Sequence, residues 1–186
     1  VLASEKVFVS RDYHFNKVKT FHHMMDERTQ EEPRAWDLEG ATHRAGFKIE
    51  ELVEFVRAAS PSEEDFGQAL SQLHQALDKA ADKVAKKTPA QQDLVGQVDA
   101  LIDTLYFTYG SFVLMGVDPE RIFDIVHQAN MGKIFPDGKA HFDPVTHKIL
   151  KPDDWEEKYA PEPAIKKELQ RQLKAYERHK ERNNTQ

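Results

Sequence analysis

The segment Val98–Gly116 carries only two charged side chains, Asp99 and Asp103, in a run that is otherwise mostly apolar. Its apolar residues continue nearly all the way round a helical wheel, which predicts a buried core helix and not a one-sided surface helix. The two aspartates are one turn apart and share one stripe of that helix. Burying two like charges side by side costs roughly several kcal/mol unless a cation or hydrogen-bond donors offset the cost. The pair therefore predicts either a metal or catalytic site or a polar core site satisfied by caps or water.

A second carboxylate set lies upstream, in the predicted helix Phe47–Ala58. Glu50, Glu51 and Glu54 fall within an arc of about 100° on that helix. Its opposite face is apolar and holds Ile49, Leu52, Val53 and Val56. The glutamates alone could therefore be the solvated side of an amphipathic helix. Together with the aspartates they offer the hard oxygen ligands that Mg²⁺ prefers.

Composition narrows the class of protein. A chain of 186 residues suits one domain, with a core at about residues 13–133 and an arm and last helix at about 134–182. The net charge of −6 argues against nucleic acid as a partner. The chain has no cysteine, which excludes disulfides and thiolate zinc sites and is compatible with a cytoplasmic protein. The first residues have no signal-peptide pattern, and the two aspartates argue against a membrane span in Val98–Gly116.

Hydrophobic spacing and capping signals predict an all-α protein with a four-helix-bundle-like core, additional short helices and a Pro-rich C-terminal arm. Ser62 is the expected N-cap of the third helix, with Asp65 completing a capping box. Thr88 and Pro89 are the expected start of the fourth helix, which ends at Gly116. The expected helices cover residues 13–27, 38–59, 63–87, 89–116, 120–131 and 163–182.

The arm Gly132–Ala164 contains five prolines and no predicted helix. His141 and Phe142 could pair with residues 148–150 in a small hairpin. A segment of this length without a helix is typical of a functional or covering element.

Helices that pool carboxylates suggest two chemistries. A di-iron carboxylate bundle needs Glu-x-x-His on two helices, whereas this chain has only Asp124-x-x-His127. The second chemistry is Mg²⁺-assisted hydrolysis of a phosphoanhydride, in which the cation bridges substrate phosphates and a spare carboxylate activates water. The sequence favours the second.

The ordered motifs resemble those of the all-α nucleoside triphosphate pyrophosphohydrolases, the MazG-like superfamily that includes phosphoribosyl-ATP pyrophosphohydrolases and dimeric all-α dUTPases. The first is Glu50-Glu51-x-x-Glu54, and the second is Asp99-x-x-x-Asp103 followed by Leu105-Tyr106 and Gly110. The stretches 126–133, 137–139 and 148–152 resemble the downstream block of the phosphoribosyl-ATP pyrophosphohydrolase-like branch. The resemblance extends over about residues 13–170.

The resemblance implies cleavage between the α and β phosphates, which releases a nucleoside monophosphate and pyrophosphate. Carried onto this chain, it implies that Glu50, Glu51, Glu54 and Asp103 bind Mg²⁺, with Mn²⁺ as an alternative ion, and that Glu50 or Glu51 also handles the attacking water. The usual second motif is Glu-x-x-Asp, and its Glu position here is Ala100. Asp99, one residue earlier, would have to supply that ligand.

Four residues downstream are expected to bind substrate. Asn130 and Lys133 match the family's asparagine near the nucleotide and its phosphate-binding lysine, and Lys148 and Lys151 provide a basic arm. Each has a plainer interpretation. Asn130 could cap a helix end, Lys133 could complement a helix dipole, and Lys148 and Lys151 could be ordinary surface residues. Trp155 is expected in the core or at an interface.

The predicted function is Mg²⁺-dependent nucleotide pyrophosphohydrolysis with a deoxynucleotide such as dUTP or dCTP as substrate, in sanitation of the nucleotide pool. The apolar fourth helix needs more cover than one short chain supplies, so we expect a homodimer or a dimer of dimers with the site near the subunit contact. The alternatives are a non-catalytic, metal-stabilised helical interaction module, a phosphohydrolase that releases orthophosphate, and a phosphoribosyl-ATP pyrophosphohydrolase.

Overall fold

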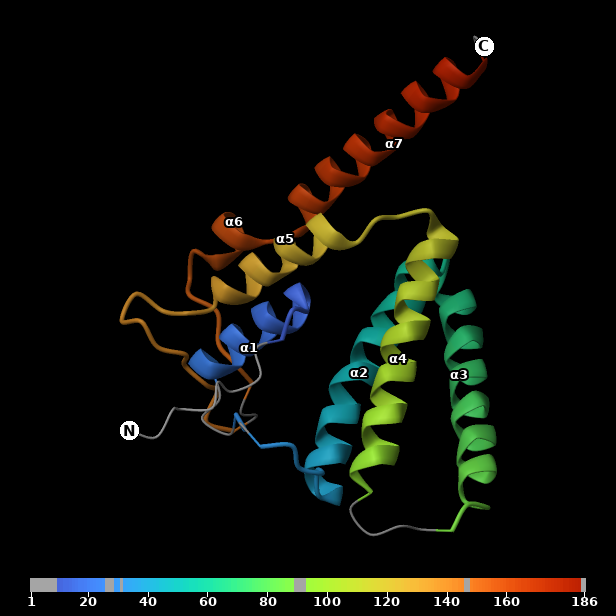
Figure 1. Ribbon diagram of the computed structural model, residues 1–186, viewed down its shortest axis with the longest axis vertical. Coiled ribbons are helices and arrows are strands. Elements are labelled where there is room, and N and C mark those ends of the chain that lie inside the picture. Colours follow the sequence, from blue (N-terminus) through green and yellow to red (C-terminus); the bar gives the residue numbers. More distant parts are fainter. Residues whose placement is uncertain (1–9, 26–28, 31, 89–92, 146–147, 185–186) are drawn as a thin grey trace, which may run out of the picture. The chain divides into compact units, whose positions relative to one another are not determined.

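A computed structural model describes residues 10–25, 29–30, 32–88, 93–145 and 148–184. Every regular element in these ranges is a helix, which confirms the predicted all-α class (Figure 1). The helices are α1 (Tyr13–Met25), α2 (Leu38–Ala59), α3 (Glu63–Val84), α4 (Leu94–Met115), α5 (Glu120–Met131), α6 (Trp155–Tyr159) and α7 (Glu162–Asn184). The chain divides into two compact units, and α4 runs from one into the other. The single domain expected from chain length stays a prediction.

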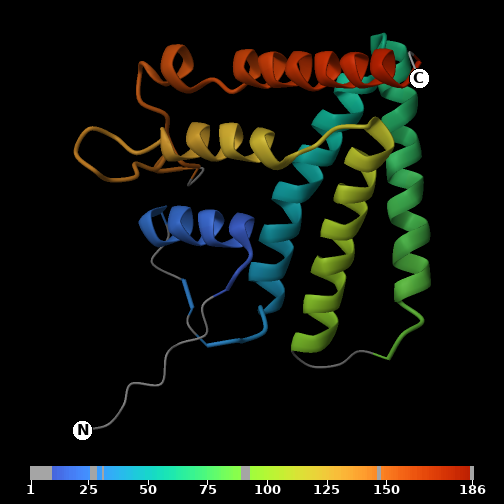
Figure 2. The same ribbon diagram turned by 45° about the horizontal axis from the view of Figure 1, so that its top comes forward.

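Unit 2 covers Glu32–Leu105 and contains α2, α3 and the first half of α4. The α2–α3 hairpin follows the predicted capping pattern, since Ser62 Oγ accepts from the Asp65 backbone N–H at 3.1 Å and donates to its carboxylate at 2.5 Å. Arg57, near the end of α2, pairs with Glu63 and lies 4.9 Å from the Phe66 ring centroid. Both views in Figures 1 and 2 show α2 alongside the first half of α4.

The fourth helix begins later than the sequence predicts. Its first residue is Leu94, and the Asp93 carboxylate accepts from the Gly96 N–H at 2.9 Å, so Asp93 and not Thr88 supplies the cap. The expected first-turn Pro89 lies outside the described residues. Gln97 in the first turn closes two hydrogen bonds with the Trp36 backbone, at 2.9 and 3.0 Å, and so joins α4 to the segment before α2. The tertiary contact, together with the aspartate cap, defines this helix start.

Unit 1 covers Val1–Glu31 and Tyr106–Gln186, and in it α5 contacts both α1 and α7. The bounds of α5 are those predicted, and the Asp118 side chain, just before the helix, accepts from the Glu120 N–H at 3.0 Å. Gln172 on α7 holds the Asp118 backbone through two hydrogen bonds of 3.0 and 2.9 Å. Beside it, Glu168 is 8% exposed and accepts two hydrogen bonds from Arg171. Side-chain hydrogen bonds therefore join α7 to the start of α5.

A second polar group joins α1 to α5. Asp124 accepts a hydrogen bond from the Tyr13 hydroxyl at 3.0 Å and pairs with Lys17 at 3.3 Å. His14 hydrogen bonds through Nδ1 to the Tyr109 hydroxyl at 2.8 Å, and its ring lies 4.2 Å from that of Phe123. The acidic member of the one Asp-x-x-His pair in the sequence therefore joins two helices, because the Asp124 carboxylate is bonded to side chains of α1.

The arm after α5 departs from the prediction at one point. The expected pairing near His141 is present as a single antiparallel bridge between Phe142 and Ile149. However, the arm also contains the short helix α6, which the five prolines had argued against. Pro152 ends the preceding extended segment, and its carbonyl accepts from the Trp155 N–H at 2.9 Å, which starts the helical turn. The last helix is α7, one residue longer at its start than predicted.

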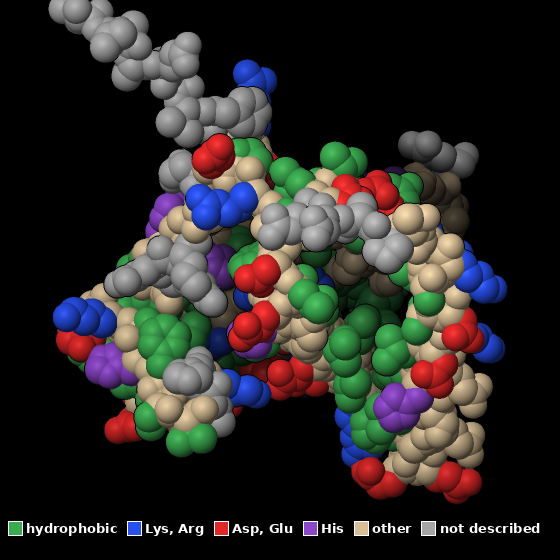
Figure 3. Space-filling view, turned by 90° about the horizontal axis from the view of Figure 1, so that it is seen from below, with side chains coloured by type: hydrophobic (Ala, Val, Ile, Leu, Met, Phe, Trp, Pro, Cys, Tyr) green, Lys and Arg blue, Asp and Glu red, His purple; other side chains and the backbone are tan. Residues whose placement is uncertain are grey.

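The prediction that the fourth helix is a buried core helix is wrong for the single chain. No residue of α2, α3 or α4 is buried. Leu114 is 90% and Phe107 73% exposed. Figure 3 shows hydrophobic side chains open to a hollow among the helices of unit 2. The pattern correctly identified an apolar helix, but one chain supplies too few neighbours to cover it. None of the described helices has the length and apolar character needed to cross a membrane.

Candidate active site

The glutamates of the first motif lie in the middle of α2, a helix capped at Asp37 by a 2.7 Å hydrogen bond to the Gly40 N–H. Glu50, Glu51 and Glu54 are all exposed. Two residues before Glu50, the Lys48 ammonium donates to the Arg44 carbonyl at 3.1 Å. Burial, followed by the nearby Arg44 charge, lowers the pKa of Lys48. This helix therefore presents three carboxylates to solvent next to a partly buried ammonium group.

The aspartates of the second motif lie in the first turns of α4. Asp99 and Asp103 are exposed, so the expectation that both are buried is wrong for the single chain. The reason is the missing cover over α4, since its apolar neighbours are exposed too. Asp99 nevertheless borders a shallow apolar depression on the same helix. The depression is lined by Leu94, Val95, Val98, Asp99 and Ile102.

The five carboxylates belong to the same unit, yet in the described part of the chain they do not form a three-ligand metal cluster. Among described residues, no cation pairs with Glu51, Glu54, Asp99 or Asp103. The donor chemistry fits Mg²⁺, because every group is a hard carboxylate oxygen. Among the described residues of α2 and α4 none is buried, so no packed side chain of these two helices draws the carboxylates together.

The predicted substrate-binding residues lie in unit 1. Asn130 and Lys133 are half-buried at the end of α5, where the Lys133 ammonium donates to the Asn130 side-chain oxygen at 2.8 Å. Lys148 lies in the arm beside the Phe142–Ile149 bridge, and its backbone carbonyl accepts from the Asp143 N–H at 2.9 Å. The structure thus brings Asn130 and Lys133 together by direct contact.

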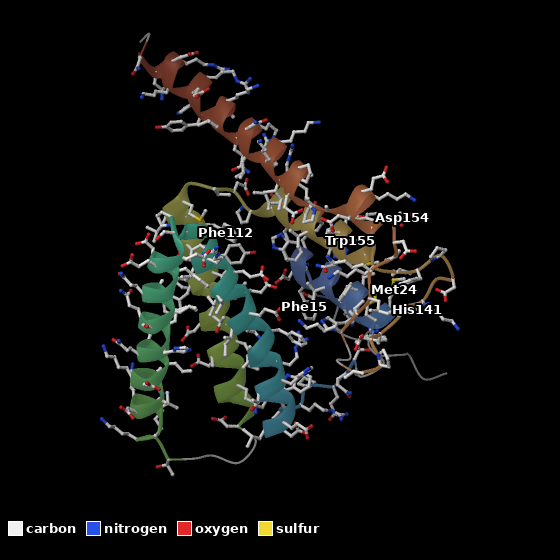
Figure 4. All side chains as sticks on the ribbon, turned by 180° about the vertical axis from the view of Figure 1, so that it is seen from behind. Phe15, Met24, Phe112, His141, Asp154 and Trp155 are labelled. Carbon is white, nitrogen blue, oxygen red and sulfur yellow. The ribbon has the colours of Figure 1, made fainter. Side chains whose placement is uncertain are left out.

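Lys151 contacts Trp155, a residue that the sequence predicts only to lie in the core or at an interface. Its ammonium lies 3.9 Å from the centroid of the Trp155 ring. Trp155 is 6% exposed, and its indole N–H donates to the Ala129 carbonyl at 2.8 Å (Figure 4). Its burial fits that assignment, but its contact with Lys151 was not predicted. A tryptophan four residues after a lysine, with a proline between them, was the available signal.

Comparison with known proteins identifies the chain. The sequence profile of the phosphoribosyl-ATP pyrophosphohydrolase family matches residues 18–130. The chain belongs to this family. A crystal structure of a "putative NTP pyrophosphohydrolase" from Exiguobacterium sp. 255-15 is similar over 90% of this chain and 99% of that one, with 38% identity and a TM-score of 0.81. No curated protein sequence matches the chain.

Family membership confirms the resemblance drawn from the carboxylate motifs and makes this protein a pyrophosphohydrolase, an enzyme that acts on phosphoanhydrides. The matched residues include both carboxylate motifs and Asn130. Lys133, Lys148, Lys151 and Trp155 lie beyond the matched residues. What the structure shows of these four residues therefore comes from the contacts that they make in this chain.

Proposed function

We propose that this pyrophosphohydrolase cleaves the α–β phosphoanhydride of a nucleoside triphosphate in a Mg²⁺-dependent reaction. The observation that carries the proposal is the set of five carboxylates on α2 and α4 in a chain of this family. Four of them have no cationic partner among the described residues, and like charges of this kind attract a divalent cation.

The carboxylates would have two roles, binding the cation and activating the attacking water. Glu50, Glu51, Glu54, Asp99 and Asp103 would hold Mg²⁺ or, as an alternative, Mn²⁺. When bound, the cation would offset the repulsion between the acidic helices and an anionic substrate. Glu50 or Glu51 would accept a proton from the water whose oxygen attacks phosphorus, and the α–β bond would break with pyrophosphate as the leaving group. Asn130 and the three lysines would orient the nucleotide and its phosphates.

A second copy of the chain is part of the proposal. Large apolar side chains along α4 are more than two-fifths exposed, a surface that monomeric proteins rarely expose. They include Val95, Val98, Leu101, Ile102 and Leu105. An isologous dimer would cover this surface and press α2 and α4 together, which would bring the carboxylates into range of one cation. A dimer of dimers remains within this proposal.

Two substrate classes follow from different observations. A deoxynucleotide such as dUTP or dCTP, hydrolysed to clean the nucleotide pool, is the first proposal and rests on the resemblance to dimeric all-α dUTPases. The name of the matched family favours phosphoribosyl-ATP as the second. Both contain the same scissile phosphoanhydride, so the carboxylate chemistry serves either.

The experiment is a product assay on the full chain with a panel of nucleoside triphosphates and phosphoribosyl-ATP. We expect a monophosphate and pyrophosphate in equal amounts, with activity that needs Mg²⁺ and is lost on chelation. Release of orthophosphate and a diphosphate would contradict the proposed bond cleavage. A chain that folds and binds Mg²⁺ without turnover on any compound would instead be a metal-stabilised module.

A further inference from the structure

Trp155 makes two contacts, one with Lys151 in the arm and one with Ala129 near the end of α5. Its indole N–H satisfies the Ala129 carbonyl, one of the last carbonyls of α5, which have no partner within the helix. The face of the same ring lies under the Lys151 ammonium at 3.9 Å. One buried side chain thus connects the arm lysine to the residue next to Asn130.

The surroundings keep this tryptophan in place. One turn further along α6, Tyr159 packs against Gly132, where a Cβ would lie 2.4 Å from the tyrosine Cγ. The small helix therefore contacts the end of α5 at two points, Ala129 and Gly132. Pro152 restricts the backbone between Lys151 and Trp155, and its carbonyl binds the Trp155 N–H. The ring is consequently a rigid support, because both its edge and its backbone are bonded.

Lys151 is held by this ring and not by a carboxylate. Among the described residues it forms no ion pair. A lysine ammonium has three N–H donors, and an aromatic face attracts it through the ring quadrupole without neutralising its charge. An ammonium held in this way can still bind a phosphate oxygen, whereas a carboxylate partner would have to be displaced first. The long side chain also loses less conformational entropy on binding, since the ring already restricts it.

We propose that Trp155 is a positioning residue for the substrate's phosphates: it holds the Lys151 ammonium on the face of a ring that is hydrogen-bonded to the end of α5, the helix end that carries Asn130 and Lys133. The basic group is then formed before substrate arrives. This inference rests on the proposed function, because it assigns a residue to the phosphate side of that site. Trp155 acts through Lys151 and does not itself touch the substrate.

The decisive experiment weakens the ring face without changing the shape or the indole N–H. In a Trp36→Phe variant, Trp155 is the only tryptophan of the chain. Replacing it biosynthetically with mono-, di- and trifluorotryptophan lowers the ring's affinity for a cation stepwise. We expect the inhibition constant of inorganic pyrophosphate to rise with each fluorine, by roughly two- to fivefold over the series, the range of a cation–π contact. A flat series would overturn the inference.

Conventional variants separate positioning from folding. In a Lys151→Met background the fluorine series should become flat, because the cation is gone. Lys158→Met is the matched control, since Lys158 lies on α6 and pairs with Asp154. That variant should leave both KM and the pyrophosphate inhibition constant unchanged. If Lys151→Met and the fluorine series were additive, Trp155 would serve only to pack α6.

Two outcomes keep this inference apart from the proposed function. If the unmodified chain releases no pyrophosphate from any compound of the panel, the proposed function fails. If it does release pyrophosphate but the fluorine series is flat, only the role of Trp155 fails. The fluorescence emission of Trp155 in the Trp36→Phe variant gives a readout that needs no turnover. We expect added pyrophosphate to change this emission when Lys151 is retained, and to leave it unchanged when Lys151→Met is also present.

Discussion

Unit 1 and unit 2 differ in what lies between their helices. In unit 1 polar side chains with several partners join α5 to α1 and α7, and all buried residues of the described chain, such as Trp155 and Glu168, are there. In unit 2 the described residues include none that is buried, and the carboxylates proposed to bind Mg²⁺ are exposed. Hydrogen bonds and ion pairs can join helices within one chain, whereas an uncovered apolar surface needs another surface to remove it from water. The carboxylates that we propose as Mg²⁺ ligands therefore lie on helices that, in our proposal, a second copy of the chain covers.

The largest effect on activity should come from replacing one of the proposed Mg²⁺ ligands in unit 2. Asp103→Asn removes a proposed cation ligand but keeps the shape of the side chain, so we expect kcat to fall on the order of 100-fold or more. The melting temperature should change little, because Asp103 is exposed and has no cationic partner among described residues. Asp78→Asn on α3 is the control and should keep full activity. A large loss of stability with unchanged kcat would make Asp103 a structural residue.

The next test compares two equally exposed side chains. Ile102 on α4 and Leu173 on α7 are both 57% exposed. We expect Ile102→Glu to convert a dimer to a monomer, because a charge inside an apolar interface is left desolvated, while Leu173→Glu leaves the assembly intact. Light scattering after gel filtration measures both masses. If both substitutions dissociated the protein, or if neither did, the contrast between the two units would be wrong.

A matched pair of glutamines tests the polar joints. Gln97 holds the Trp36 backbone and Gln172 holds the Asp118 backbone, each through two hydrogen bonds. Glutamate keeps the shape but cannot donate. We expect Gln172→Glu to lower the free energy of unfolding by about 1–3 kcal/mol, and Gln97→Glu to cost less. The difference arises because Gln172 also donates to Glu168, so a new carboxylate there meets a like charge. Urea unfolding measures both changes.

The smallest effect concerns pH. Hydrogen bonds from Arg171 and then Gln172 hold the pKa of Glu168 at about 2, below its ordinary value of 4.5. A depressed carboxylate pKa stabilises the fold above pH 4.5, and this stabilisation is lost as the pH falls toward 2. Glu168→Gln should therefore lower the melting temperature by a few degrees at pH 7, with the difference shrinking below pH 4.5. A difference that does not depend on pH would contradict the ion-pair explanation.

Sequence patterns predicted the helices well where local signals are strong. Leu38–Ala59 and Glu120–Met131 have the predicted bounds, because short-range signals mark them: Ser60-Pro61 follows the first helix and Asp118-Pro119 precedes the second. The start of α4 and the helix α6 were missed. The first depends on Asp93 together with the Trp36–Gln97 contact, and the second on a tryptophan that packs against a helix far away in sequence.

The candidate site divides in the same way. The residue types and their helical spacing pointed to phosphoanhydride hydrolysis, because five carboxylates on two helices offer the hard oxygen ligands that Mg²⁺ prefers. Family membership confirms that reaction class. Neighbouring residues along one helix cannot show which distant side chain holds Lys151, nor whether one chain covers α4. Those facts depend on contacts between segments distant in sequence, and only the tertiary structure decided them: an indole placed under an ammonium, and an apolar helix left exposed.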